Sequence, residues 1–81
     1  MLVEMTEYLV KSLVTDKEAV TVKEFPSDDD KEIIIEVLVS NDDMGKVIGK
    51  NGKIANAIRV LVQANSYLQD NKRVKINIES F

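Results

Sequence analysis

The chain has no cysteine and no histidine among its 81 residues. Without cysteine it has no disulfide framework and no thiolate metal site, and without histidine it lacks the commonest zinc ligand and general base. An enzyme would then need paired carboxylates or an activated lysine, serine or tyrosine, and no two acids have a spacing that suggests such a pair. We therefore expect a protein that is not an enzyme and that uses no metal and no cofactor.

Aromatic residues and long apolar runs are also scarce. The only aromatic residues are Tyr8, Phe25, Tyr67 and Phe81, and none of them lies beside a glycine. A row of stacked bases, as RRM and OB folds use, is therefore not expected. No apolar stretch is long enough to cross a membrane, and the N-terminus lacks the features of a signal peptide. We expect a cytoplasmic protein with one domain, residues 1–81, and one modest core.

The charges separate along the chain. Residues 1–43 contain four bases and twelve acids, a net charge of −8, whereas residues 44–81 contain seven bases and two acids, a net charge of +5. The overall charge of −3 by itself argues against a nucleic-acid partner. The basic half, however, contains all three glycines and has no acid between Met44 and Gln69. Because of this asymmetry, an anion-binding site is expected within residues 44–81.

In the first half, the hydrophobic pattern predicts a helix followed by two strands. Apolar residues spaced by three and four indicate a helix over residues 2–14, with Thr15 and Asp16 as a loop. Strands are expected over residues 20–25 and 32–39, joined as an antiparallel hairpin by the breaker-rich turn 26–31. The acids Asp28, Asp29 and Asp30 in that turn lack the spacing of a calcium loop, so we interpret them as solvated. The second strand is apolar on both faces, which favours a central position.

In the second half, the pattern predicts two helices and a last strand. Asn41 is expected to cap a short helix, with Asp42 and Asp43 at its positive end, and Gly49 is expected to end it. A longer helix begins near Gly52, and its apolar stripe is expected to contain Ile54, Ile58, Leu61 and Leu68, flanked by Ala57, Val62 and Ala64. Alternation over residues 74–78 gives the final strand. The fold class is α+β, in the order α-β-β-α-α-β, with a three-stranded mixed sheet covered on one face by three helices.

Gly49 and Gly52 bracket Lys50 and Asn51 at the turn between the two helices. Glycines allow positive φ and close approach of a backbone, and free N–H groups at the start of a helix favour phosphate. The alternative is that both glycines only end and begin two packed helices, because short glycine motifs have a high rate of false matches. A Walker A loop or a dinucleotide fingerprint would need a glycine at position 47, where the chain has Val47.

Residues 47–54 read Val-Ile-Gly-Lys-Asn-Gly-Lys-Ile, which resembles the core motif of KH domains. The predicted order of elements matches the type II KH arrangement. The longer stretch 43–59 looks like the small bacterial KhpA family of single-KH RNA-binding proteins, and the likeness extends over residues 2–79. The motif together with chain length and element order makes this resemblance specific.

The resemblance implies a groove that holds about four nucleotides of single-stranded RNA. It also implies a homodimer and a larger Jag-like KH protein as partners, with no role for a membrane. Phosphate contacts are expected from the loop and its neighbouring cations, apolar contacts from the floor of the groove, and backbone or base contacts from Arg59 and the pair Lys72 and Arg73. The expected binding residues are Gly49, Lys50, Asn51, Gly52, Lys53 and Lys46 at the phosphates, Val47, Ile54 and Ile58 as candidates for the floor, and Arg59 beside it. Some of the three floor candidates must instead serve the core.

Two other hypotheses stay open. In the first, the chain is a protein-interaction module with a KH fold and little RNA binding, for which Val60 and Tyr67 supply an apolar strip. The alternative for these two residues is that they pack at the margin of the core. In the second, the ligand is single-stranded DNA, because a loop that grips phosphates does not read the 2′-hydroxyl.

Overall fold

The computed structural model describes residues 2–81. Their order of elements is α-β-β-α-α-β, as the sequence predicts, with short 3₁₀ turns between some of them. The helices and strands are α1 Leu2–Lys11, β1 Thr21–Pro26, β2 Glu32–Val39, α2 Met44–Ile48, α3 Lys53–Gln69 and β3 Arg73–Ser80. The 3₁₀ turns are η1 Lys17–Ala19, η2 Asn41–Asp43 and η3 Lys50–Gly52.

The three strands form one mixed sheet with β2 in the centre. β1 pairs with β2 in antiparallel register, with Val22 opposite Val37, and β3 pairs with β2 in parallel register, with Ile76 opposite Ile35. Every second residue of β2 from Ile33 onward is buried on the helix side, as strand geometry requires. The central position and the pairing directions predicted from the sequence are confirmed.

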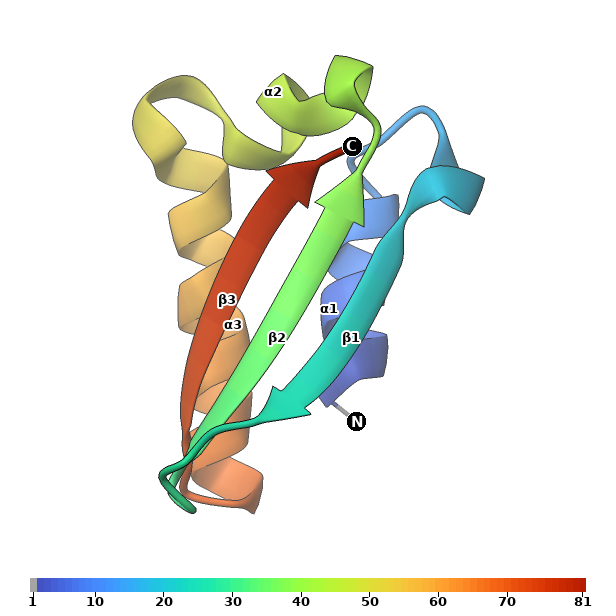
Figure 1. Ribbon diagram of the computed structural model, residues 1–81. Helices are drawn as coiled ribbons and strands as arrows, with labels where there is room; N and C mark the ends of the chain where they lie inside the picture. The colour runs from blue at the N-terminus through green and yellow to red at the C-terminus, as the bar shows by residue number, and fades with distance from the viewer. Residues whose placement is uncertain (1) are drawn as a thin grey trace.

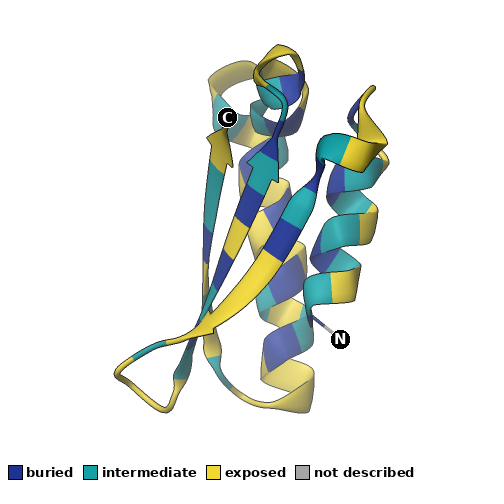
Figure 2. Cartoon of the chain, turned by 45° about the vertical axis from the view of Figure 1, so that its right-hand side comes forward, coloured by how far each residue is buried: buried dark blue, intermediate teal, exposed yellow. Residues whose placement is uncertain are grey.

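The helices lie on one side of the sheet, with α1 behind β1 and α3 behind β3 (Figure 1). α2 sits over the end of this layer, where β2 and β3 finish, and it contributes Val47 to the core. The buried positions gather where sheet and helices face each other (Figure 2). None of the helices within residues 2–81 has the length and apolarity that a membrane crossing requires.

α3 buries a different stripe from the predicted one. The buried residues are Ala55, Ile58, Val62 and Ser66, whereas Leu61 is 50% exposed and Leu68 is 86% exposed. The prediction of Ile58 was therefore right, and the inclusion of Leu61 and Leu68 was wrong. Two small residues explain the difference, because Ala55 and Ser66 let the helix lie close to the sheet, and the Ser66 hydroxyl donates to the Lys72 carbonyl at 2.7 Å.

Asp43 has a role that the sequence did not indicate. The expected cap was Asn41, but Ser40 occupies the N-cap of η2, and Asp43 is the N-cap of α2 without capping it through its side chain. The Asp43 carboxylate is buried and accepts hydrogen bonds from the backbone N–H groups of Thr15 and Asp16, both at 3.0 Å. Ser40 also donates its hydroxyl to this carboxylate at 3.1 Å.

These bonds accompany an early end of the first helix. The prediction extended the helix to Val14, but α1 ends at Lys11. Val14 is still in the core, reached by a turn in which the Leu13 N–H donates to the Val10 carbonyl at 3.0 Å. Because the N–H groups of Thr15 and Asp16 donate to the Asp43 carboxylate, they are not available for another turn of helix. One carboxylate thus joins the loop before β1 to the start of α2.

Replacing Asp43 with asparagine should lower the thermal midpoint by roughly 5–10 °C at pH 7, because an amide cannot accept two N–H bonds on charged oxygens. The hydrogen bonds from Asp16 and then Thr15 hold the pKa of Asp43 well below its ordinary value. A lowered pKa in the folded state stabilises the protein above the unfolded pKa of about 3.9, and this contribution disappears as the pH falls through the folded value. The gap between wild type and Asp43→Asn should therefore be full at pH 7 and narrow steadily below about pH 4.

Thermal unfolding followed by circular dichroism between pH 7 and pH 2 measures this gap. Asp42→Asn is the matched control, since Asp42 is exposed, and it should change the midpoint by about 3 °C or less. A gap for Asp43→Asn that stays constant down to pH 2 would contradict an ionic role for the carboxylate.

Candidate nucleic-acid interface

The loop between α2 and α3 is built from backbone conformations that few residues adopt. Gly49 has φ 75° and ψ 175°, and Gly52 has φ 75° and ψ 12°. Between them, Asn51 also lies in the left-handed region at φ 58°. α2 ends where the Gly49 N–H donates to the Gly45 carbonyl at 2.9 Å. The chain then reverses within η3 and enters α3 at Lys53.

The three glycines have different reasons to be glycine. A Cβ at Gly49 would lie 2.6 Å from Cγ1 of Ile54, which is closer than atoms can pack. A Cβ at Gly52 would meet nothing within 4 Å, so only its positive φ favours glycine. Gly45 lies inside α2 with open space around it and no positive φ. Gly49 is therefore the position where the backbone needs both the conformation and the space.

The loop presents charge at the start of a long helix, where the N–H groups of Gly52 and Lys53 already donate to the carbonyls of Gly49 and Lys50. Lys50, Asn51 and Lys53 are exposed. Gly52 is the N-cap of α3, and no side chain caps that end. The first N–H groups of a 17-residue helix, together with its dipole, therefore face the same region as two lysines. This arrangement favours an anion with several oxygen acceptors.

Lys46 points to a different part of the molecule. Its ammonium group pairs with the Asp43 carboxylate at 3.4 Å and donates a hydrogen bond to the Thr15 hydroxyl. Lys46 was expected to add charge at the loop, but in this structure its charge is shared with the Asp43 junction.

The three residues expected on the apolar floor have different exposures. Val47 has no exposed surface and Ile58 is 4% exposed, so both belong to the core. Ile54 is half-buried and packs against Gly49, which makes it the member of the three with surface beside the loop.

Beyond the loop, α3 runs along the outer edge of β3, and side chains join the two. Arg59 donates from Nε to the Ile76 carbonyl at 3.3 Å. The Gln63 amide accepts from the Val74 N–H at 2.8 Å and donates to the Lys72 carbonyl at 2.9 Å. Gln63 thus satisfies two backbone groups of an edge strand, a role that its position in the sequence did not reveal.

These bonds leave the other end of the edge open. Val74 and Ile76 direct backbone groups away from β2, so the alternation of the strand directs those of Ile78 to the same side. Among residues 2–81 no side-chain hydrogen bond reaches the Ile78 backbone. The open end of β3 is the end toward the loop between α2 and α3 (Figure 1).

Comparison with known proteins identifies relatives along almost the whole chain. Residues 3–78 match the family model described as KhpA/KhpB, KH domain. The RNA-binding protein KhpA of Clostridium perfringens is 47% identical over 75 residues, which cover 93% of this chain and 96% of that protein. KhpA of Caldanaerobacter subterraneus has the same identity and coverage, and KhpA of Borreliella burgdorferi is 40% identical over 94% of this chain and 89% of its own length.

The fold also occurs in solved structures of a larger protein. A crystal structure of Era with MgGDPNP and nucleotides 1506–1542 of 16S ribosomal RNA superposes with a TM-score of 0.68, and one of Aquifex aeolicus Era with a TM-score of 0.70. Both are 18% identical to this chain, which spans 29% and 30% of their lengths. This likeness concerns the fold alone.

Substitutions at the three glycines should distinguish the energetic cost of a steric clash from the cost of a left-handed backbone conformation. Gly49→Ala should lower the free energy of unfolding by about 3 kcal/mol, because it combines strain with a clash against Ile54. Gly52→Ala should cost about 1 kcal/mol, the strain of a left-handed alanine. Gly45→Ala is the matched control and should stabilise by about 0.5–1 kcal/mol, because alanine favours the helix.

Urea unfolding measures all three variants. If Gly49→Ala and Gly52→Ala lower the free energy of unfolding equally, the close approach of Ile54 to Gly49 does not determine which residues position 49 accepts.

Proposed function

Because the chain belongs to the KhpA/KhpB KH-domain family, we propose that it acts as one KH unit that binds single-stranded RNA and catalyses no reaction on it. The observation that carries this proposal is the exposed loop 49–52 at the uncapped start of α3, with Lys50 and Lys53 beside it. In this role the two lysines and the uncapped start of α3 hold consecutive phosphates. The name RNA-binding protein, which the KhpA relatives carry, supports RNA as the nucleic acid.

The RNA strand follows the surface where α3 and β3 meet, which we call the α3–β3 seam. Ile54 offers apolar surface next to the phosphate grip, and the open backbone edge at Ile78 offers donors and acceptors for the edge of a base. Phosphate contacts position a strand without reading its sequence, so base preference comes from the neighbouring groove. With this small number of contacts we expect low sequence specificity.

The net charge of −3 limits the strength of binding. Only a few cations reach the phosphates, and Lys46 is engaged with Asp43. Binding by one copy should therefore be weak and dependent on salt. A second binding unit in the same assembly would raise the affinity through effective concentration, without new contacts in the groove.

The outer face of α3 supplies a surface for a second copy. The α3 strip, as we define it, consists of Ala57, Leu61, Ala64 and Leu68, at spacings of four, three and four residues. Leu61 is 50% exposed, Leu68 is 86% exposed, and both alanines are exposed. The spacing is that of a helix–helix seam, with small residues between large ones.

A second copy of this chain is the occupant that fits the α3 strip best. The strip has no charge of its own, so two copies meet there without repulsion, and its alternation of large and small residues is self-complementary about a twofold axis. Two grooves in one dimer give the avidity that one groove lacks. The larger Jag-like KH protein implied by the resemblance is the other candidate occupant.

The double variant Lys50→Asp/Asn51→Asp should bind labelled single-stranded RNA on the order of tenfold more weakly or worse, because it puts acids where phosphates lie. The slope of log affinity against log salt should fall by about 0.7 for each phosphate that the loop no longer holds. Fluorescence anisotropy with RNA and with DNA of the same sequence measures both effects, and circular dichroism checks folding. An aspartate is compatible with the positive φ at position 51, so the fold should persist.

The control Ser12→Asp/Lys17→Asp makes the same change of net charge near the end of α1 and in η1, away from the seam. It should reduce binding far less. If the wild type binds neither nucleic acid, or if both double variants bind alike, the loop 49–52 does not hold phosphates. The protein-interaction hypothesis is then favoured. Tighter binding of DNA than of RNA would instead identify single-stranded DNA as the ligand.

The double variant Leu61→Gln/Leu68→Gln should be monomeric at concentrations where the wild type is dimeric, because it replaces the two largest apolar side chains of the α3 strip without adding charge. Light scattering should show the mass falling from twice the chain mass to the 9.1 kDa of one chain. Tyr8→Gln is the control, since Tyr8 is 73% exposed on α1 and should leave the dimer intact. A monomeric wild type at high concentration would exclude self-association and leave the strip to a different KH protein.

A further inference from the structure

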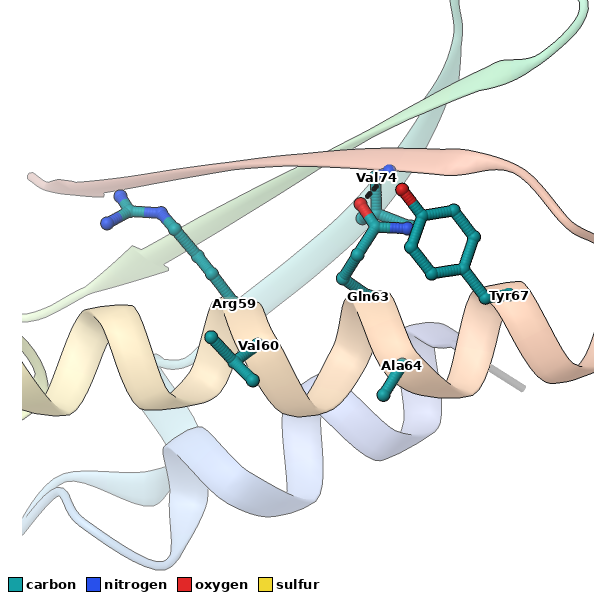
Figure 3. A pocket seen from close by; sticks show the side chains of 6 residues that line it. All are labelled: Arg59, Val60, Gln63, Ala64, Tyr67 and Val74. Atoms are coloured by element: carbon teal, nitrogen blue, oxygen red, sulfur yellow. Dashed lines mark hydrogen bonds between the residues drawn. The ribbon is translucent and has the colours of Figure 1, made fainter.

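A trough of about 450 Å³ lies between α3 and the outer edge of β3, farther along the seam than the loop 49–52. Figure 3 shows Arg59, Gln63 and Tyr67 rising from successive turns of α3 toward β3. They are four residues apart, so they share one face of the helix. The residues that line the trough are Arg59, Val60, Gln63, Ala64, Tyr67 and Val74.

The walls of the trough suit a flat, uncharged ring. Val60 and Val74 supply apolar surface, Ala64 lies where the trough borders the α3 strip, and the guanidinium of Arg59 and the ring of Tyr67 stand at the two ends of the trough. The Gln63 amide in the middle is already bonded to β3 through its oxygen and to the Lys72 carbonyl through its nitrogen. Aromatic rings and guanidinium planes are the surfaces on which unstacked RNA bases lie in proteins.

The trough is continuous with the proposed RNA path. At about 1.5 Å of rise per residue, Arg59 lies about 9 Å along α3 from Lys53, and Tyr67 lies about 12 Å beyond Arg59. No acid lies on α3 over this distance. A strand held by its phosphates at the loop would therefore meet the trough as it follows the helix.

A second hollow beyond Tyr67 limits how far the RNA strand continues along the seam. Tyr67 also lines this second hollow, where Lys31 and Arg73 are accompanied by Asp29 and Glu32. The two acids offset the two bases, so the hollow has no net attraction for a further phosphate. The path of favourable charge thus ends close to the Tyr67 ring.

We propose that this trough is an additional base subsite, in which a nucleobase next to the four-nucleotide groove stacks on Tyr67 while Arg59 closes the opposite end. The subsite rests on the RNA binding proposed above and adds one position to it. Because Gln63 is occupied, the subsite selects for a planar ring rather than for one pattern of hydrogen bonds. Tyr67 is then a base-stacking residue, one of the roles that the sequence left open for it, rather than part of an apolar strip with Val60.

A length series of oligouridylates and oligoadenylates tests the subsite. A tetramer fills the groove itself, whereas a hexamer extends into the trough. The wild type should bind the hexamer about tenfold more tightly than the tetramer, the effect of one stacked base, and should gain little more from an octamer. Tyr67→Ala should bind the tetramer like the wild type and lose the gain of the hexamer, whereas Tyr67→Phe should keep it.

Two controls separate stacking from self-association and from folding. Leu61→Gln/Leu68→Gln leaves the trough unchanged, so it should retain the ratio of hexamer to tetramer affinity. Light scattering and circular dichroism on Tyr67→Ala check its mass and fold, and the 55% exposure of Tyr67 predicts that it folds.

The possible contrary results are distinct. The subsite is refuted if Tyr67→Ala keeps the full gain, if it weakens tetramer and hexamer equally, or if it changes only the mass measured by light scattering. In each of these cases RNA binding by the loop still stands. If the wild type binds none of the oligonucleotides, the proposed function fails first.

Discussion

The close approach of Ile54 to Gly49 is the constraint on which the loop between α2 and α3 depends. The chain must leave α2, reverse and begin α3 within a few residues, and the Ile54 side chain lies where a Cβ at position 49 would be. This packing directs the start of α3 outward, so that Lys50, Asn51 and Lys53 are exposed together above an uncapped helix end. It also joins the loop to the core, because Ile54 packs against the core while Val47 and Ile58 are buried in it.

Much of the fold follows from local patterns in the sequence. The β-branched run of β2 and the breakers before it predict the central strand and its hairpin, and the register agrees with that prediction. The position of the loop between two helices was also predictable, because glycines have strong local effects. The stripe that α3 buries was not predictable in full, since this helix has two apolar stripes with helical spacing. Periodicity finds both but cannot tell which one the sheet covers. The small residues Ala55 and Ser66 decide the matter through close packing, which only the three-dimensional arrangement reveals.

Contacts between distant residues account for the other differences. Asp43 looked like an acid at the start of a helix, yet its carboxylate binds backbone groups 27 and 28 residues earlier in the chain. That pairing also explains why Lys46 is directed away from the loop and why α1 is shorter than its apolar pattern. In the same way nothing in the sequence pattern singles out Gln63, but it closes part of the β3 edge. Polar residues with long-range partners leave no periodic signal.

α3 presents three faces with different surroundings. One face packs on the sheet, the next bonds to the edge of β3 and borders the trough, and the outer face remains apolar and exposed. Over 17 residues the helix contains only two charged side chains, Lys53 and Arg59, and both lie on the path proposed for RNA. A helix whose solvent side served only solubility would be expected to have more charge there. The scarcity of charge is therefore best explained by contacts. In the proposed arrangement, the loop holds phosphates, the trough takes a base without reading it, and a second copy on the outer face supplies the affinity that one copy of net negative charge does not reach alone.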